Sequence, residues 1–180
     1  MPKPLSVANA CGAFILPHAS QNILYVKPRY FAWPWAWPSV PNNQLIQIPS
    51  AVVETESIKW ETKPNYNGVY VSGVNAGTLA LVKKLGTAGD YLDTMVTDSL
   101  ITSAAAARQR GGTILSQTGR MATISISLPV LPETGIIRPG RLIKYVDSGQ
   151  TILGMSKSVS VSLQGGPSLR QSIELEVHYG

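Results

Sequence analysis

Histidine and paired carboxylates are the side chains that could support acid–base chemistry or metal binding in this chain, and both are scarce. Histidine is the usual general base and a common metal ligand, but only His18 and His178 occur. Neither has a further metal-ligating residue two or four positions later in the chain, so a zinc site has little support.

The best candidate for a catalytic pair is Glu174 with Glu176, which lie two positions apart in an alternating segment. Strand geometry would place their carboxylates about 7 Å apart on one face, a spacing that resembles a glycosidase pair. The same spacing arises in any half-exposed strand, and the sequence offers no cleft that would keep one carboxyl protonated. We therefore expect no catalysis from this pair.

Other reactive residue types also lack a catalytic or ligand-binding pattern. Asp90, Asp93 and Asp98 lack the glycine and terminal glutamate of a calcium loop, so we expect a solvated loop and a helix cap. Phosphate-binding and nucleophile-elbow motifs do not occur. Cys11 is the single cysteine, which excludes an intrachain disulfide, and its small apolar neighbours predict a buried thiol. We expect a protein that is not an enzyme and holds no metal or cofactor.

An aromatic segment at residues 28–38 carries three of the four tryptophans at every second position, interrupted by prolines. This pattern predicts an irregular, extended path. The rings could stack on bases or sugars, or they could be buried anchors that pin an arm onto the domain or a neighbouring subunit. Base stacking normally comes with a basic groove, and only Lys27 and Arg29 are close, so we favour anchoring. The candidate anchors are Arg29, Tyr30, Trp33, Trp35 and Trp37.

The elements that must carry these residues are mostly strands. Apolar and polar residues alternate strictly in Thr123–Leu128, Ser158–Leu163 and Ile173–Tyr179, which predicts a sheet buried on one face only. The outward residues are mainly small hydroxyls, which offer little catalytic chemistry. They are candidate subunit contacts, in particular Ser125, Ser127, Ser160 and Ser162.

Upstream of these strands the sequence predicts two helices. The first covers residues 5–16 and is stopped by Pro17. The second runs from Ser99 to about Gln117, capped by Asp98 or Thr97. Its Gly111–Gly112 pair suggests close backbone packing or a split into two turns. Further short strands are expected at 23–26, 45–48, 52–62, 69–73 and 78–84.

Composition limits the possible classes of protein. The 180 residues are 44% hydrophobic, enough for a core, but only 14% charged, against roughly 25% in ordinary soluble domains. Much of the surface is therefore expected to meet other subunits. The net charge of +5 is scattered, without a nucleic-acid arm or a polybasic membrane segment. Neither a signal peptide nor a transmembrane segment is expected, so we predict a cytoplasmic protein unless a particle carries it out.

These patterns together predict an α+β fold that is mainly antiparallel β. We expect a small β-barrel with one main helix, and an irregular Trp/Pro-rich N-terminal arm. The predicted domains are 1–64, a helix and strand subdomain with that arm, and 65–180, the barrel with its helix at about 99–117.

Six short segments between residues 60 and 180 follow one another in a recognisable order. They are Tyr66–Gly73, Gly86–Asp90, Ala107–Gly111, Leu128–Pro132, Pro139–Ile143 and Arg170–Glu176. In this order, and as several moderate matches, they resemble the baseplate-hub or tail-tip proteins of tailed phages related to the late control gene D family.

The resemblance implies a virion protein assembled in the host cytoplasm and located at the distal tail. Such hubs are similar to those of type VI secretion spikes and form trimeric rings around the tail axis, through which DNA passes. They join the tail tube to the tip or fibres, so the implied partners are further copies, the distal tail or tube protein, and tip or fibre proteins. These hubs are usually longer and carry two barrels, so this chain resembles a split or C-terminal component with a partner chain.

Two other classes of function remain open at this stage. A nucleic-acid- or carbohydrate-binding barrel could use Trp33, Trp35, Trp37 and Trp60 as stacking platforms. A cell-wall hydrolase is a weaker alternative, because no convincing acid and base pair is present.

Overall fold

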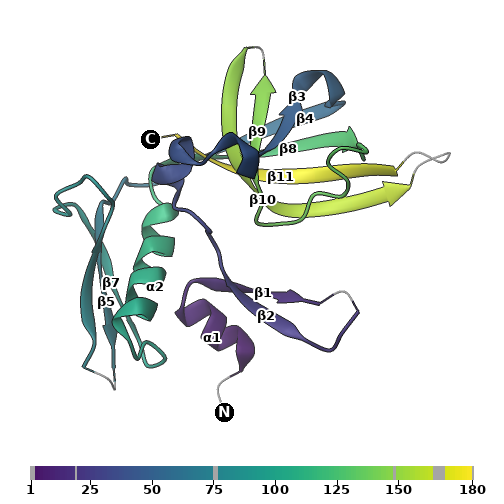
Figure 1. Cartoon of the computed structure of the whole chain (residues 1–180). Coiled ribbons are helices and arrows are strands. Elements are labelled where there is room, and N and C mark those ends of the chain that lie inside the picture. Colours follow the sequence, from purple (N-terminus) through teal and green to yellow (C-terminus); the bar gives the residue numbers. More distant parts are fainter. Residues whose placement is uncertain (1–2, 19, 75–76, 148, 164–168, 180) are drawn as a thin grey trace. The chain divides into compact units, whose positions relative to one another are not determined.

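The structure is a computed structural model that describes residues 3–18, 20–74, 77–147, 149–163 and 169–179. The chain forms two compact units, each made of two segments (Figure 1). The first unit contains Met1–Trp35 and Pro64–Thr118, and the second contains Ala36–Lys63 and Gly119–Gly180. This division differs from the predicted domains, 1–64 and 65–180, because segments distant in the sequence pack together.

The first unit consists of two helices, a hairpin and a three-stranded sheet. Strands β1 and β2 form an antiparallel hairpin, and the sheet order is β6-β5-β7, with β6 antiparallel and β7 parallel to β5. The elements are α1 (Pro4–Ala10), β1 (Ala13–Pro17), β2 (Leu24–Pro28), β5 (Gly68–Gly73), β6 (Leu79–Lys83), β7 (Leu92–Asp98) and α2 (Ala104–Ser116).

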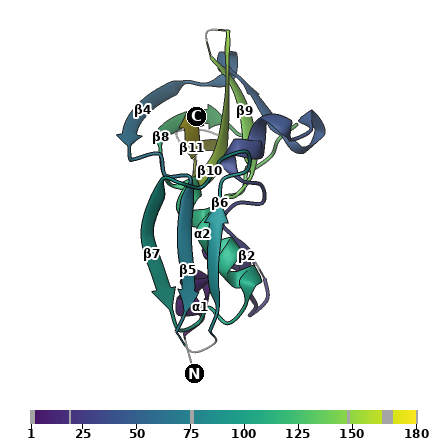
Figure 2. The same cartoon turned by 90° about the vertical axis from the view of Figure 1, so that its left-hand side faces the viewer.

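Helix α2 covers one face of the three-stranded sheet, and Figure 2 shows β5 in front of it between β6 and β7. Alternate residues of β5 and β6 point toward α2, which is why they are apolar. The side chains buried between sheet and helix are Val69, Val71, Val82, Ile101, Ala107 and Leu115. The other face of α2 meets the N-terminal segment, where Thr113 Oγ1 donates to the Gly12 carbonyl at 3.1 Å.

The prediction of a helix over residues 5–16 was wrong in its length. Helix α1 ends at Ala10, and the chain turns at Gly12, whose φ of 63° suits glycine. A Cβ atom there would lie 2.5 Å from Thr113 Oγ1, so the close approach also requires glycine. Residues 13–17 then continue as β1. Cys11, predicted to be buried, is half-buried in this turn.

Helix α2 begins five residues later than predicted. Ser103 is the N-cap, and its Oγ accepts from the Ala106 amide at 3.2 Å. Asp98 instead accepts from the Leu100 amide at 2.9 Å, in a turn at the end of β7. This local bond offers the backbone an alternative to the helix, so the predicted caps do not start one.

We expect Ser103→Ala to lower the free energy of unfolding by about 1 kcal/mol, because it removes the acceptor for one free amide of the first turn. Ser99→Ala is the matched control, since Ser99 lies before the helix and outside its capping bond. Urea denaturation monitored by circular dichroism measures both. An equal loss in the two variants would contradict the observed helix start.

The acidic cluster was predicted to be a solvated loop and a cap, and this is partly wrong. Asp93 and Asp98 lie in β7, which pairs in parallel with β5. Asp90 precedes this strand, and the Asn67 side-chain amide donates to its Oδ1 at 2.8 Å, which lowers the pKa of Asp90. The group is therefore part of the sheet and its connection to β5.

The second unit is a six-stranded sheet with short 3₁₀ helices. Its order is β3-β9-β10-β11-β8-β4, antiparallel except for the parallel pair β3 and β9. The strands are β3 (Ile46–Pro49), β4 (Thr55–Thr62), β8 (Arg120–Pro129), β9 (Leu142–Asp147), β10 (Gln150–Leu163) and β11 (Leu169–Tyr179). The 3₁₀ helices are η1 (Pro34–Ser39), whose first two residues belong to the first unit, η2 (Asn42–Gln44) and η3 (Ser50–Val52).

The alternation predicted for the C-terminal strands is confirmed by burial in Thr123–Leu128 and in most of Ile173–Tyr179, where Glu176 is buried as well. In Ser158–Leu163 it is not, because Val161 and Leu163 are 41% and 68% exposed. Apolar residues of β8 and β11 form one core with β3 and β9, while their polar neighbours point outward. The fully buried members include Ile124, Ile126, Leu128, Ile143, Ile173 and Leu175.

The sheet of the second unit curls but does not close. Tyr145 of β9 donates its hydroxyl to Glu56 of β4 at 2.5 Å, although three strands separate β9 and β4 in the sheet order. Among the described residues, β3 and β4 each pair on one side only, so no closed barrel forms. The α+β class, the mostly antiparallel pairing and the single main helix are as predicted, but the barrel is not found. In the described part of the chain, no helix has the length and apolar character needed to span a membrane.

Candidate interaction surface

The aromatic segment packs onto its own chain. Within the first unit, Trp33 and Trp35 stack with ring centroids 5.7 Å apart, and Tyr30 lies 6.3 Å from Trp33. The Trp33 ring lies directly on α2, where a Cβ atom at Gly112 would come within 2.4 Å of it. Arg29 lies at the end of the same helix, with its guanidinium 3.0 Å from the Gln117 side-chain amide. The first four predicted anchors are thus brought together.

The path of this segment was predicted to be extended, but Pro34–Ser39 forms the 3₁₀ helix η1. Prolines suit such a turn because their φ is already fixed near the required value. Trp37 is only 2% exposed and packs edge-to-face on the His178 ring, with centroids 5.1 Å apart. A ring that is buried in this way is not accessible to bases or sugars.

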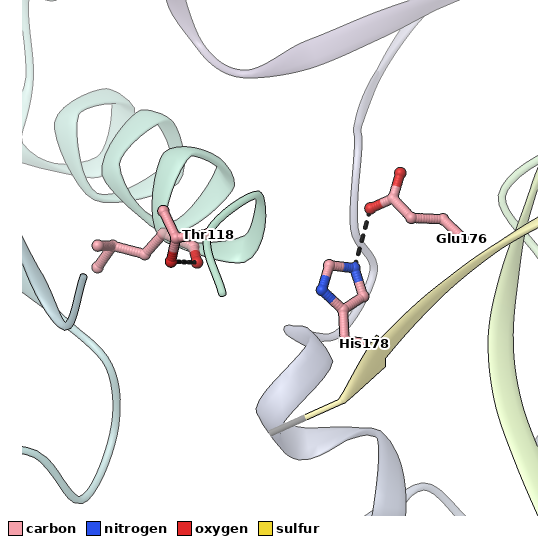
Figure 3. A network of polar contacts seen from close by, with 4 residues as sticks. Thr118, Glu176 and His178 are labelled. Atoms are coloured by element: carbon pink, nitrogen blue, oxygen red, sulfur yellow. Dashed lines mark hydrogen bonds and ion pairs between the residues drawn. The ribbon is translucent and has the colours of Figure 1, made fainter. Parts of the chain in front are cut away.

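His178 and Glu176 form a largely buried polar pair on the face of β11 opposite the apolar core. His178 Nε2 lies 3.0 Å from Glu176 Oε1, and Glu176 is 7% exposed (Figure 3). Figure 3 also shows Thr118, which lies just after the end of α2 and whose Oγ1 donates to the Leu115 carbonyl at 2.8 Å. Glu174, the other carboxylate of the candidate pair, accepts from Ser158 at 2.7 Å. The two carboxylates therefore have separate structural partners.

The predicted serine contacts do gather on one face. Ser127 of β8 pairs with Ser172 of β11, which pairs with Ser160 of β10. Residues opposite one another in an antiparallel ladder project on the same side, so these hydroxyls form a row across the strands. We call this surface the hydroxyl face. Its members are Thr55, Ser57, Ser125, Ser127, Ser158, Ser160, Ser162 and Ser172, all exposed or half-exposed.

An exposed aromatic cluster lies on the opposite face of the sheet. This is the face that carries the core, but at this end of the strands it is exposed to solvent. Trp60 of β4 is 49% exposed and Tyr179 of β11 is 37% exposed, with ring centroids 4.9 Å apart. The Arg120 guanidinium lies over the Trp60 ring, 4.5 Å from its centroid. An aromatic pair beside an arginine has the residue types found at the energetic centres of protein interfaces. We call it the Trp60 cluster.

Burial raises the pKa of the Tyr179 phenol, and the Arg120 guanidinium opposes part of this rise. The folded state therefore holds the phenol proton more tightly than the unfolded chain, and the stability from this group is lost as pH rises through the raised pKa. The absorbance titration of Tyr179→Phe, subtracted from that of the wild type, isolates the ionisation of the Tyr179 phenol. We expect the midpoint of this difference curve to lie above the ordinary tyrosine pKa of about 10. A midpoint at or below that value would contradict the packing of Tyr179.

Sequence reasoning found Trp60 but missed its two neighbours. Arg120 and Tyr179 lie opposite each other in the ladder between β8 and β11, and Thr62 lies opposite Arg120 in the next strand. Only the strand register brings these positions together, and the alternation pattern alone does not specify which strands are neighbours. Among the described residues, no group of three or more histidine, cysteine, aspartate or glutamate side chains could hold a metal ion.

No protein-family model and no curated protein matches this sequence. Solved structures do match its fold. A tail protein from Neisseria meningitidis MC58 is 16% identical, with a TM-score of 0.54 over 94% of this chain and 52% of its own. The 43 kDa tail protein of prophage MuSo2 from Shewanella oneidensis is 14% identical, with a TM-score of 0.53 over 93% of this chain and 50% of its own.

A chain in the virion of a native gene transfer agent particle is similar as well. It is 14% identical, with a TM-score of 0.54 over 96% of this chain and 38% of its own. The chain thus shares the fold of phage tail proteins, and it spans about half of the two tail proteins and less of the virion chain.

Proposed function

We propose that this chain is a structural protein of a phage tail, located in the virion. The observation that carries the proposal is the fold, because the likeness to two tail proteins and one virion chain extends over both units. A low charged fraction and an exposed aromatic cluster support it, since both are expected of a subunit that is buried in an assembly.

The proposal extends to a place in the tail, the baseplate hub or tail tip. There the chain would form a ring, trimeric by its resemblance to hub proteins, that joins the tail tube to the tip or fibres and surrounds the DNA exit channel. The chain spans about half of the two tail proteins, and by its resemblance to hub proteins it would act together with a hub partner chain. Assembly would take place in the host cytoplasm.

The role we propose is mechanical and involves no catalysis. The two glutamates best placed for acid–base chemistry have structural partners, Ser158 and His178. The alternative of a nucleic-acid or carbohydrate module is disfavoured for the tryptophans of the arm, because Trp37 is buried and Trp33 packs on Gly112.

The two surfaces described above are the proposed subunit contacts. The Trp60 cluster would contribute a central anchor, because an exposed tryptophan and arginine lose most of their hydration on docking. The hydroxyl face would contribute hydrogen bonds over a wide, weakly charged area. This division of roles is typical of interfaces, in which a few side chains carry most of the binding energy.

A complementation experiment tests this function. Particles are produced with the wild type, with Trp60→Ala and with Leu85→Ser, a control whose side chain is also apolar and exposed but lies in the first unit. Mass spectrometry then measures the amount of the chain per particle. We expect Trp60→Ala to lower incorporation about tenfold or more and Leu85→Ser to leave it unchanged.

Two results would contradict the proposal. If purified wild-type particles lack the chain, it is not a virion protein. If Trp60→Ala and Leu85→Ser are incorporated equally well, the Trp60 cluster is not a subunit contact. Light scattering of the purified chain separately tests the ring, for which a trimer is expected and a monomer at all concentrations would count against it.

A further inference from the structure

Within the described part of the chain, strand β6 has a pairing strand on one side only. It is an edge strand, since the sheet order is β6-β5-β7. The Lys84 amide donates to the Asn67 carbonyl at 2.9 Å, and the Gly73 amide donates to the Thr78 carbonyl at 2.7 Å. Main-chain groups alternate in direction along an antiparallel strand, so those of Leu79, Leu81 and Lys83 point away from β5. These three residues form the free edge of β6.

A groove runs beside this edge. Its volume is about 220 Å³, and it is lined by residues 80–83 of β6 and by Ala104 and Arg108 of α2. Ala104 and Arg108 are four residues apart, so they lie on the same side of the helix. Further along the helix, α2 packs tightly on the strand, since a Cβ atom at Gly111 would lie 2.6 Å from Val82. The free edge and the helix thus form two walls of one groove.

The groove has a positive charge and no carboxylate in its lining. Arg108 is exposed and forms no ion pair within the described part of the chain. The Lys83 side chain lies on the other face of β6, with those of Leu79 and Leu81, where it donates to the Ala88 carbonyl at 3.1 Å. Asp90, the acidic residue in the same connection, is bonded to Asn67. On the α2 side of the strand, a ligand with a carboxylate would therefore meet Arg108, which pairs with no carboxylate among the described residues.

The free edge carries a single charged residue, Lys83, at its end, and it lacks the other features that usually protect edge strands. Natural edges carry prolines, bulges or several charges that prevent pairing. Strand β6 has no bulge or proline, and Leu79 is 62% exposed on the face away from α2. The other edge, β7, has a register shift opposite β5 and carries Asp93 and Asp98. The two edges therefore differ, and β6 is the one suited to pairing.

We propose that the groove binds an extended segment of a partner protein, which adds to β6 as a further strand. Its main chain would bond to the amides and carbonyls of Leu79, Leu81 and Lys83, as in strand addition to other sheet edges. Side chains of an added strand alternate between the two faces. Those on the α2 side would meet Arg108 and are acidic, and those on the other side would meet Leu79 and Leu81 and are apolar. The partner segment thus alternates acidic and apolar residues. The inference does not depend on the proposed tail location.

Hydrogen exchange with a synthetic peptide tests the proposal. The probe is a short peptide that alternates valine and glutamate, and the full chain is followed by nuclear magnetic resonance. We expect the amides of Leu79, Leu81 and Lys83 to become protected, whereas those of Ala80 and Val82, which already point toward β5, change little. A peptide with lysine in place of glutamate is expected to bind about tenfold more weakly or less, because it meets like charge.

Two sets of variants make the test specific. Arg108→Gln should weaken binding of the glutamate peptide about tenfold, while Lys27→Gln, an exposed cation on β2, should not. Two peptides with N-methyl groups on alternate amides test the main-chain bonds without any change to the protein. Methylation of the amides that face β6 should abolish binding, whereas methylation of the amides that point away from β6 should not.

Three outcomes would overturn the proposal. The first is no protection of the free edge at millimolar peptide. The second is equal binding of the lysine and glutamate peptides. The third is protection of these amides in the concentrated chain without peptide, which would show that a second copy occupies the edge.

Discussion

Replacing Leu175 by alanine is expected to lower the free energy of unfolding of the second unit by about 2–5 kcal/mol. Leu175 is fully buried in the middle of β11, and its ladder partners are Ile124 of β8 and Ser156 of β10. The strand is paired on both sides, so neighbouring side chains can move only slightly into the cavity that the substitution leaves. The loss therefore includes both the lost burial and the unfilled space.

Ser172→Ala is the matched control, because Ser172 lies on the same strand but on the exposed hydroxyl face. It should change stability by no more than about 0.5 kcal/mol. Hydrogen exchange of the β8 and β11 amides, measured at increasing urea concentration, reports the stability of this unit alone. If both variants lost the same amount of stability, the assignment of core and outward faces would be wrong.

The second large effect is expected from Gly111→Leu in α2. Leucine is a better helix former than glycine by about 1 kcal/mol, which alone would stabilise the helix. At this position, however, the first added atom would lie 2.6 Å from the Val82 Cβ and Cγ2 atoms, which are part of the packed core. Overpacking of this kind costs about 1–3 kcal/mol for small additions, and leucine adds three more carbons beyond Cβ. We therefore expect a net loss of about 2 kcal/mol or more.

Ala105→Leu is its control, since Ala105 is exposed on the same helix. It should leave the thermal midpoint nearly unchanged, while Gly111→Leu lowers it. A stabilised Gly111→Leu variant would mean that α2 does not approach β6 as closely as described, and it would also weaken the case for the groove between them.

The elements that were predicted well are those with a local pattern. Alternation placed β8, β10 and β11 and identified the buried faces of β8 and β11, because a side chain's face follows directly from its position along a strand. The apolar residues of Ser158–Leu163 in β10 are largely exposed, so alternation alone does not ensure burial. The Gly111–Gly112 pair predicted close packing, and the structure places Val82 and Trp33 against it. Both features can be predicted from one segment of sequence.

The features that were missed depend on contacts between distant segments. Strand β7 carries aspartates and threonines and shows no apolar face of its own, so its parallel pairing with β5 was not predicted. The open sheet, predicted as a barrel, depends on whether β3 and β4 meet, which no local pattern specifies. The residues of the candidate interaction surfaces also fall into those that a local pattern predicts and those that depend on distant contacts. The serines of the hydroxyl face follow from alternation, whereas Arg120 and Tyr179 join Trp60 only through the register.

Electron cryomicroscopy of the tailed particles that encode this chain is the most direct test of the central claim, a structural role in the phage tail. We predict density at the distal end of the tail that fits both units of the chain, repeated in a ring around the tail axis, with the Trp60 cluster in contact with a neighbouring subunit. Complete, infective particles in which no density fits the chain, and from which it is absent by mass spectrometry, would contradict the account.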